Sequence, residues 1–598
     1  MRFLACFTLV TFAWADTRVR PDVYLDNIKF LASEKLKGRG TGTKELDLAA
    51  EYIAKKFKSF GLKPVPGTNA FGQTFTVTTR ARLTPGNRLQ YTVGGETKSL
   101  KSSKDFVAFN FSESGKASGQ VVFAGYGITA SEYGYDDYAG LDVKGKIVLL
   151  LRQEPQEFDE KSKFEGKAYT AHSQLQNKAV NAKIHGAKAV IFMNTLFNRQ
   201  GTDDKLEIFP RAAGPGNSGI PFVQIRAEET AAWFEAAGKD LKVLCEEIDK
   251  DLKPQSFAFP DSLKIDLAVD IQRQARQVRN VSAYLAGDTD EYVVIGAHYD
   301  HLGFGEQFSL GTPGQVHPGA DDNASGTSGV IELARYFAKQ KKMKRGILFL
   351  TFAGEELGLL GSAHYVTNPS MPLNKAVAMI NMDMIGRIRD GKVFLAGSGT
   401  GSTFKAMLGE LTAKYSDFKV DLSETAGYGS SDHTSFTTKQ VPVLFFFSGL
   451  HGDYHKPSDT WDKIDSKGAA QLLDLVGDIL ERLANGTERP QYVRVEPPQM
   501  RQGGSGGGSG YGPYFGSIPD FSEPPTGVRF ADVRAGSPAE KAGLKGGDIM
   551  IEFGGQKVGN LQDYTYLLRQ KKPGDEVVVK YLRNGETMET KVTLTKRN

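Results

Sequence analysis

Histidines and acidic residues gather in one part of the chain, between residues 298 and 455. Seven of the nine histidines lie in this stretch. The candidate chemical groups share one property: each lies at the end of an apolar run that is typical of a strand, or in the loop after it. They are His298 and Asp300 after "VVIGA", Asp321 and Asp322 in "HPGADDNASGTSG", Glu355 and Glu356 after "ILFLTFAG", Asp383 after "AMINM", and His455 in "HGDYHKPSDTWD". Imidazoles mixed with carboxylates are the ligands that zinc takes at an open catalytic site.

Glu355 and Glu356 are adjacent acids that end the apolar run "GILFLTFAGEELG". Two like charges at the end of a buried strand lower stability unless a cation lies beside them. A divalent metal bound by one glutamate removes that repulsion, and the other glutamate can stay off the metal and transfer protons. Adjacent residues at a strand end point in different directions, so the two acids can take different roles.

The elements that must position these groups alternate between apolar strands and amphipathic helices. Strands are predicted at "EYVVIGAHYD", "RGILFLTFAGEE", "AVAMINMDMIG" and "VPVLFFFSG", and helices at 323–339 and 402–415. This alternation predicts an α/β fold whose mostly parallel, mixed sheet has helices on both faces. Ligand sites in open α/β sheets gather beyond the carboxyl ends of the strands, which is where the candidate residues lie.

The 598-residue chain is too long for one core and divides into several parts. The region of the candidate site comprises 16–104 and 261–490. A separate α/β unit occupies 105–260, a Gly-, Ser- and Pro-rich linker occupies 491–512, and a small strand-rich domain occupies 513–598. The formal net charge of +4, without a basic block, argues against nucleic-acid binding. No run after the N-terminus reaches the ~18 uncharged apolar residues of a membrane span.

The N-terminus, "MRFLACFTLVTFAWAD", predicts a secretory signal peptide at 1–15 that is cut before Asp16. Cys6 leaves with that segment, so Cys245 remains alone and the mature chain forms no intrachain disulfide. Export without disulfides suits a bacterial periplasm or exterior, and we expect the protein to be secreted or periplasmic.

Five segments in order resemble the zinc metallopeptidase family 28, the group of bacterial leucyl aminopeptidase, glutamate carboxypeptidase, glutaminyl cyclase and the transferrin receptor. The segments are "GAHYDH", "HPGADDNASG", "FAGEELGLLGS", "NMDMIG" and "YHKPSDTWD", and "LASEKLKGRGTGTKE" near the N-terminus fits as well. The resemblance implies two Zn²⁺ per chain. One zinc would take His298 and Asp383, the other would take Glu356 and His455, and Asp321 would bridge them.

The same resemblance implies the catalytic roles. Glu355 would be the general base that takes a proton from a water between the metals. Asp300 would hydrogen-bond the His298 imidazole and fix its tautomer. Tyr454 is where some relatives place a tyrosine that steadies the oxyanion. The peptide bond between the two aspartates is cis in the family, so a cis Asp321–Asp322 bond is expected.

Other histidines compete for these roles. His301 is the alternative to His298, and His451 is the alternative to His455 from the same loop. His317 and His433 are expected at the rim or behind the ligands, and Asp432 resembles a family segment beside the pocket. Ordinary surface or core positions are expected for three more histidines: His172, His185 and His364.

Two further modules are recognised by resemblance. The unit at 105–260, with "GQVVFAGYGITASEYGYDDYAGLDVKGKIVLLL", resembles a protease-associated (PA) domain, which serves as part of a cleft's rim or as a spacer. The unit at 513–598, with "GVRFADVRAGSPAEKAGLKGGDIMIEFGGQKV", resembles a PDZ domain, which binds a peptide or protein ligand as an added strand. Such a domain recruits a partner, feeds substrate to the catalytic part or holds the assembly together. Its carboxylate-binding loop would fall at Tyr514-Phe515-Gly516-Ser517.

These observations predict an exported two-zinc aminopeptidase that acts on peptides with a free N-terminus. Three alternatives remain at this point: a related dipeptidase or carboxypeptidase, a single-zinc glutaminyl cyclase, and a binding protein without activity. The sequence does not distinguish zinc from manganese or cobalt.

Overall fold

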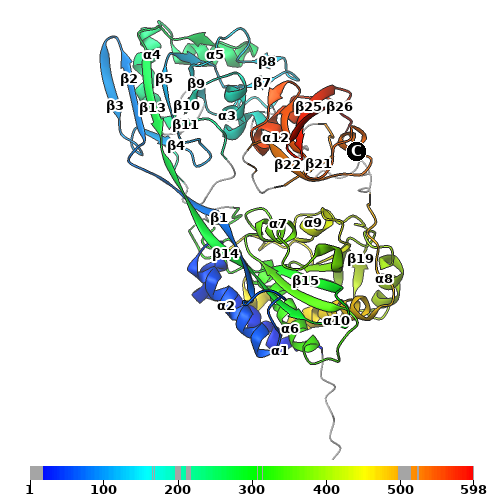
Figure 1. Cartoon of the computed structure of the whole chain (residues 1–598). Coiled ribbons are helices and arrows are strands. Elements are labelled where there is room, and N and C mark those ends of the chain that lie inside the picture. The colour runs from blue at the N-terminus through cyan, green and yellow to red at the C-terminus, as the bar shows by residue number, and fades with distance from the viewer. Residues whose placement is uncertain are drawn as a thin grey trace, which may run out of the picture. The chain divides into compact units, whose positions relative to one another are not determined.

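The computed structural model describes residues 18–164, 166, 169–194, 204–209, 217–305, 308–312, 314–495, 513–520, 524 and 526–596. The predicted signal peptide lies outside the described residues, and so does the predicted linker from 496 onward. The chain forms two compact units (Figure 1): unit 1 is Met1–Phe75 with Gln277–Pro498, and unit 2 is Thr76–Arg276 with Gln499–Asn598. No helix in the described ranges is long and apolar enough to cross a membrane.

Unit 1 is built on a mixed sheet whose strand order, over the described residues, is β1-β14-β16-β15-β17-β20-β18-β19. The strands are β1 (Gly72–Leu83), β14 (Ile271–Leu285), β15 (Tyr292–His298), β16 (Gly346–Phe352), β17 (Ala376–Met382), β18 (Lys392–Ala396), β19 (Lys419–Asp421) and β20 (Val443–Phe447). The central strands β16, β15, β17 and β20 run parallel, whereas β14 and β18 pair antiparallel with β16 and β20. The predicted α/β fold with a mostly parallel, mixed sheet is confirmed.

Helices cover both faces of this sheet, as the alternation of side chains along β16 shows. Leu348 and Leu350 pack with Tyr365 of α7 and Phe436 of α9. Phe349, between them, faces the other way and meets the ring of Phe57 in α2, with centroids 6.2 Å apart. Figure 1 shows the two layers. The helices are α1 (Pro21–Leu31), α2 (Lys44–Ser59), α6 (Gly326–Phe337), α7 (Leu360–Thr367), α8 (Phe404–Thr412), α9 (His433–Thr437) and α10 (Ser466–Asn485).

The N-terminal part of unit 2 contains two larger sheets. One, in the order β12-β6-β9-β10-β11-β4, has β9 parallel to β6 and β10, and the other has the order β3-β2-β13-β5. The strands are β2 (Arg88–Val93), β3 (Glu96–Leu100), β4 (Phe106–Ala108), β5 (Gly115–Gly119), β6 (Val121–Phe123), β7 (Thr129–Ala130), β8 (Tyr135–Asp136), β9 (Ile147–Leu151), β10 (Ala189–Met193), β11 (Phe222–Ile225), β12 (Phe257–Ala258) and β13 (Lys264–Val269). The helices are α3 (Leu175–Ile184), α4 (Ala231–Ala236) and α5 (Leu241–Asp251).

The chain passes between the units inside β1 and β14, and not at 104/105 and 260/261 as the sequence suggested. The difference has a physical cause: β2 pairs with β13, whose residues 264–269 follow the predicted end of the inserted unit. The strands between 76 and 104 therefore belong to unit 2. An alternating pattern identifies a strand but not its partner.

The C-terminal part of unit 2 is a strand-rich sheet in the order β21-β22-β23-β25-β26, with β24 paired to β23. Its elements are β21 (Ser517–Pro519), β22 (Val528–Val533), α11 (Pro538–Lys541), β23 (Ile549–Phe553), β24 (Gln556–Lys557), α12 (Leu561–Arg569), β25 (Glu576–Arg583) and β26 (Glu586–Thr593). Over the described residues β21 forms one edge of the sheet, and the predicted carboxylate-binding loop at 514–517 runs directly into it.

The C-terminal part contacts α3 of the same unit through α12. The Lys183 ammonium lies 2.5 Å from the Asp563 carboxylate, and Asp563 is only 2% exposed at its side chain. The Asn560 side chain donates to the Asn217 carbonyl at 2.7 Å. Ile184 packs against the hydrophobic core of the C-terminal part. The contact therefore consists of an ion pair with a buried carboxylate, a hydrogen bond and one apolar side chain.

Candidate metal centre

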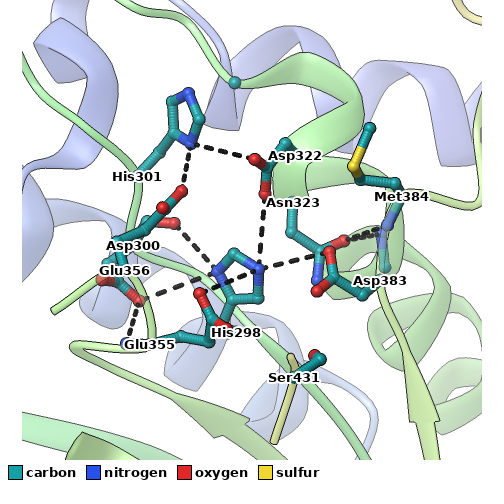
Figure 2. A network of polar contacts seen from close by, with 12 residues as sticks. His298, Asp300, His301, Asp322, Asn323, Glu355, Glu356, Asp383, Met384 and Ser431 are labelled. Carbon is teal, nitrogen blue, oxygen red and sulfur yellow. Dashed lines mark hydrogen bonds and ion pairs between the residues drawn. The ribbon is translucent and has the colours of Figure 1, made fainter. Parts of the chain in front are cut away.

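The candidate site lies at the carboxyl ends of the parallel strands of unit 1 (Figure 2). Each of its side chains comes from the end of a strand or from a loop or turn beside one. His298 ends β15, Glu355 and Glu356 follow β16, Asp383 follows β17, Asp322 lies in the turn Ala320–Ser325 before α6, and His455 lies in the loop after β20.

One group of donor atoms combines His298, Asp322 and Asp383. The Nε2 atom of His298 lies 3.4 Å from Asp322 Oδ1 and 3.3 Å from Asp383 Oδ1. Two ligands of a tetrahedral zinc lie roughly 3.3 Å apart, given zinc–ligand bonds of about 2.0–2.1 Å. The Nδ1 atom of His298 donates to the Asp300 carbonyl at 3.2 Å, so Nε2 keeps its lone pair for a metal.

A second group combines Asp322, Glu356 and His455. The Nε2 atom of His455 lies 3.3 Å from Asp322 Oδ2 and 3.2 Å from Glu356 Oε2. Its Nδ1 atom donates to the Phe308 carbonyl at 2.8 Å, which again leaves Nε2 free to ligate. The two oxygens of Asp322 therefore face two different histidines, which is the arrangement of a bridging carboxylate.

Asp321, the predicted bridging ligand, does not face the two groups of donor atoms, whereas the adjacent Asp322 does. Asp321 Oδ1 accepts a hydrogen bond from the Gly386 amide at 2.7 Å, and Oδ2 lies 3.1 Å from His451 Nε2, away from the metal-ligating groups. The backbone turns at Asp322 and Asn323, whose dihedral angles are not helical, so successive side chains point in different directions. The cis peptide bond lies one residue later than predicted, between Asp322 and Asn323.

Asp300 occupies the predicted place but makes a different contact. Its carboxylate lies 3.8 Å from His298 Nδ1, too far for the predicted hydrogen bond, because the Asp300 carbonyl takes that proton. The carboxylate instead accepts from the Glu355 amide at 3.1 Å and from the Thr41 hydroxyl at 2.7 Å. Asp300 thus holds the backbone of the residue predicted as general base.

Glu355 lies beside the donor groups, with Oε2 3.8 Å from His298 Nε2. Burial raises the pKa of Glu355 well above its ordinary value, and the negative charges of Glu356 and Asp383 raise it further, although His298 opposes them. Burial by itself lowers the pKa of His298, but Asp383 and Glu355 raise it well above its ordinary value. The cluster is therefore strongly anionic and favours any positive charge.

Tyr454 stacks on the ring of His455, with centroids 3.9 Å apart. Burial raises the pKa of Tyr454, and the charges of Asp322 and Glu356 raise it further. Its hydroxyl therefore stays protonated and able to donate a hydrogen bond beside the cluster.

The two competing histidines have separate places. His451 accepts from the Asp453 amide at Nδ1 and turns Nε2 toward Asp321, so it does not face the donor groups. His301 does face them, with Nδ1 2.6 Å from Glu356 Oε1. The sequence treated His301 only as a substitute for His298, whereas the structure has both in the cluster.

Asp432 and His433 lie at the N-terminal end of α9, and both are buried. Burial lowers the pKa of His433 to about 3 and raises the pKa of Asp432 to about 7. His433 stacks on Phe445, with ring centroids 4.3 Å apart. The Nε2 atom of His317 lies 2.7 Å from the Ser309 hydroxyl, and this hydrogen bond lies within the loop that joins β15 to the turn Ala320–Ser325.

Asp459 has a role that the sequence did not reveal. Its carboxylate accepts from the backbone amides of Asp321 at 3.0 Å and of Asp322 at 3.1 Å. It therefore holds the turn that presents Asp322. The signal available in the sequence is its position in "YHKPSDTWD", four residues after His455. One loop then carries both a predicted metal ligand, His455, and the residue that holds the turn of Asp322.

Comparison with known proteins agrees with the predicted families. Residues 280–480 match peptidase family M28, residues 117–233 match the PA domain and residues 501–594 match the PDZ domain. Aminopeptidase YwaD of Bacillus subtilis (strain 168) is 28% identical over 393 residues, which is 64% of this chain and 72% of that protein. An aminopeptidase of Pseudomonas aeruginosa (strain UCBPP-PA14) is 25% identical over 442 residues, which is 72% of this chain and 70% of that protein.

Among solved structures, BSAP, described as a zinc aminopeptidase from Bacillus subtilis, is 22% identical with a TM-score of 0.47, covering 79% of this chain and 98% of its own. The five catalytic segments, the three family matches and the α/β architecture agree with one another. Three parts of the chain are therefore similar to known families: 280–480 to peptidase family M28, 117–233 to the PA domain and 501–594 to the PDZ domain.

Proposed function

We propose that the chain is a two-zinc aminopeptidase that hydrolyses N-terminal residues from peptides. The observation that carries the proposal is Asp322, whose oxygens face His298 at 3.4 Å and His455 at 3.3 Å. One zinc would be held by His298, Asp322 and Asp383, and the other by Asp322, Glu356 and His455. These donor sets, of imidazole nitrogen and carboxylate oxygen, are those of catalytic zinc sites.

The charge of the cluster fits two dications. Its carboxylates outnumber its imidazoles, and all are largely buried: Asp300, Asp322, Glu355, Glu356 and Asp383 against His298, His301 and His455. Burying carboxylates without a positive partner is costly. Bound cations would remove that cost, which is a physical reason for the arrangement.

When bound, the two zinc ions would lower the pKa of a shared water and polarise the scissile carbonyl. Glu355 would accept the proton of the attacking water and later pass it to the leaving amine. Asp300 holds the Glu355 backbone in place through its amide, at 3.1 Å. The Tyr454 hydroxyl would donate a hydrogen bond to the carbonyl oxygen as negative charge develops there.

The end of the peptide that is cleaved is inferred from relatives. The Bacillus subtilis and Pseudomonas aeruginosa proteins are named aminopeptidases and match most of this chain. We therefore propose substrates with a free N-terminus. We also propose a peptide or protein ligand for the PDZ domain. Such ligands add as a strand to a sheet edge, and β21 lies at the edge of this sheet.

Export to the periplasm or the exterior is also proposed. It rests on the signal-like residues 1–15 and is consistent with Cys245, a buried free cysteine without a disulfide partner in the described residues. N-terminal sequencing of the exported protein would test it; a chain that begins at Asp16 supports the proposal, and an uncut chain retained in the cytoplasm contradicts it.

Metal analysis combined with a peptide panel tests the proposed activity. The expected result is two zinc ions per chain, with cleavage of peptides that have a free N-terminus and no cleavage of N-blocked ones. One zinc with cyclisation of N-terminal glutamine identifies a cyclase, and release of C-terminal residues identifies a carboxypeptidase. Cleavage of blocked peptides identifies an endopeptidase, and bound metal without turnover of any peptide identifies a binding protein.

Asp322 and Asp321 form a matched pair for testing the bridge. Asp322→Asn should lower the affinity for both metals, because its two oxygens face both groups of donor atoms. Asp321→Asn should keep both metals, since the remaining oxygen can still accept from the Gly386 amide. Equal metal loss in the two variants, measured by metal analysis after dialysis, would contradict the assignment of Asp322.

A further inference from the structure

His301 is a buried imidazole in the cluster that the proposed ligand sets do not use. It follows β15, and its backbone amide donates to the Arg39 carbonyl at 3.2 Å. The ring lies against Gly319, where a Cβ atom would come within 2.4 Å of the imidazole. This close packing fixes the direction in which the ring points.

The orientation of His301 is opposite to that of the two histidines proposed as ligands. His298 and His455 each donate from Nδ1 to a backbone carbonyl and turn Nε2 toward the carboxylates. His301 turns Nδ1 toward them, and its buried Nε2 has no hydrogen-bond partner among the described residues. Figure 2 shows the His301 ring facing Glu356 and Asp322.

Distances separate a ligand from a hydrogen-bond donor at this place. The ligand atoms of one zinc lie roughly 3.3 Å apart, and the pairs made by His298 and His455 lie at 3.2–3.4 Å. His301 Nδ1 lies 2.6 Å from Glu356 Oε1, which is a hydrogen-bond distance, and 3.8 Å from Asp322 Oδ2. His301 therefore has the geometry of a donor to Glu356.

We propose that His301 is a positioning residue, which donates from Nδ1 to Glu356 Oε1 and so leaves Oε2 for the metal beside His455. The proposal rests on the proposed two-metal function. Glu356 has two oxygens on a flexible side chain, and the hydrogen bond selects one orientation. Partners of this kind typically alter metal affinity by about 10–100-fold.

Three variants of His301 test the proposal through metal binding. His301→Ala removes the donor. His301→Asn places an amide nitrogen close to the position of Nδ1, whereas His301→Gln places it close to the position of Nε2. Zinc dissociation constants are measured by competition with a chelator, and cobalt-substituted protein reports the coordination of each site by its visible absorption.

The expected result is selective. His301→Ala and His301→Gln should lower the affinity for one of the two zinc ions by about 10–100-fold and leave the affinity for the other within about threefold of wild type. His301→Asn should restore most of the lost affinity and the cobalt spectrum. Thermal unfolding of the metal-free variants, within a few degrees of wild type, confirms that the apo chains are folded.

Several outcomes would overturn the proposal. Unchanged zinc affinity in His301→Ala would show that the hydrogen bond does not matter. Equal loss in Asn, Gln and Ala would indicate that the imidazole ligates the metal directly, and rescue by Gln alone would assign the role to Nε2. A wild-type chain that binds fewer than two zinc ions would instead refute the two-metal function itself.

Discussion

Glu355 differs from the neighbouring Glu356 in what each side chain faces. Glu356 lies between two imidazoles, with one oxygen 2.6 Å from His301 and the other 3.2 Å from His455. Glu355 has no such contact within hydrogen-bond distance in the described residues; its oxygen lies 3.8 Å from His298. A carboxylate beside a metal site but outside its ligands is suited to proton transfer.

Glu355→Gln should therefore keep both metals and lose most turnover. The amide has nearly the same shape but cannot accept the proton of the attacking water, so kcat should fall by about 10²–10⁴-fold. Metal analysis and steady-state kinetics on a small aminoacyl substrate check this. A variant with two metals and wild-type kcat would rule out Glu355 as the base.

A buried neutral histidine makes stability depend on pH. His433 has a pKa of about 3 in the folded chain because it is buried, against about 6.5 when unfolded. The unfolded state thus binds more protons below about pH 6.5, and stability falls as the pH decreases from there toward 3. Between pH 7 and pH 5 this one group costs about 2 kcal/mol.

His433→Phe should remove that part of the acid sensitivity while keeping the stacking on Phe445. Urea unfolding of the metal-free protein at pH 7 and pH 5 measures it, and the difference between the two pH values should shrink in the variant. Asp432, whose raised pKa acts in the opposite direction, is present in both proteins and cancels in the comparison. An unchanged difference would contradict the assignment.

At the level of single residues, the sequence predicted most of the donor groups but not their detailed contacts. His298, Glu356, Asp383 and His455 come together as predicted, because strand ends in a parallel sheet converge. Asp321 and Asp322 look alike to any pattern of polarity, and only the backbone of the turn decides which one faces inward.

Turns and loops carry most of the proposed metal ligands, so the hydrogen bonds within these turns and loops decide the geometry of the site. The loop after β20 supplies His455 and, four residues later, Asp459, which accepts from two successive amides of the turn that holds Asp322. These hydrogen bonds join the loop after β20 to the turn Ala320–Ser325, which is far from it in sequence. A change in Asp459 should act on the turn without touching a metal-ligating group.

Asp459→Ala should destabilise the metal-free protein, because it leaves two buried amides without acceptors at a cost of about 1–3 kcal/mol each. Asp459→Asn keeps one oxygen and should lose less. Chemical denaturation of both apo variants gives the comparison. Equal stability of Asp459→Ala and wild type would show that the turn holds itself.

Both predicted helices of unit 1 are present, and each is shorter than the sequence suggested. The helix expected at 323–339 is α6, Gly326–Phe337, and it begins later because the turn Ala320–Ser325 holds Asp322. The helix expected at 402–415 is α8, Phe404–Thr412. Periodicity identifies a helix, whereas its first turn depends on contacts that are distant in sequence.

All proposed metal-ligating groups belong to unit 1, whereas the PDZ domain belongs to unit 2. Removal of 496–598 should therefore leave hydrolysis of a small aminoacyl substrate largely intact. The same truncation removes Asp563, the partner of Lys183, and uncovers Ile184 on α3. We expect wild-type kcat/KM within about threefold, together with a lower unfolding temperature of the PA part.

Kinetics and calorimetry of the truncated chain separate these effects. Lys183→Met in the full-length protein is a matched control, since it breaks the ion pair but keeps the rest of the PDZ domain. Loss of activity in a folded truncated chain would assign the PDZ domain a part in catalysis, and an unchanged unfolding temperature would show that the contact adds no stability.

The two strands that pass between the units are neighbours in one sheet. Phe71 accepts from the Ser282 amide, and the Arg82 side chain bonds that of Gln272, so β1 and β14 run in opposite directions over much of their length. Figure 1 shows them side by side. In effect they form a hairpin whose tip has been replaced by residues 84–270, which belong to unit 2. A short turn could close that hairpin without shifting the register of β14 on β16, so the strand ends that hold the candidate site would keep their positions without the inserted residues.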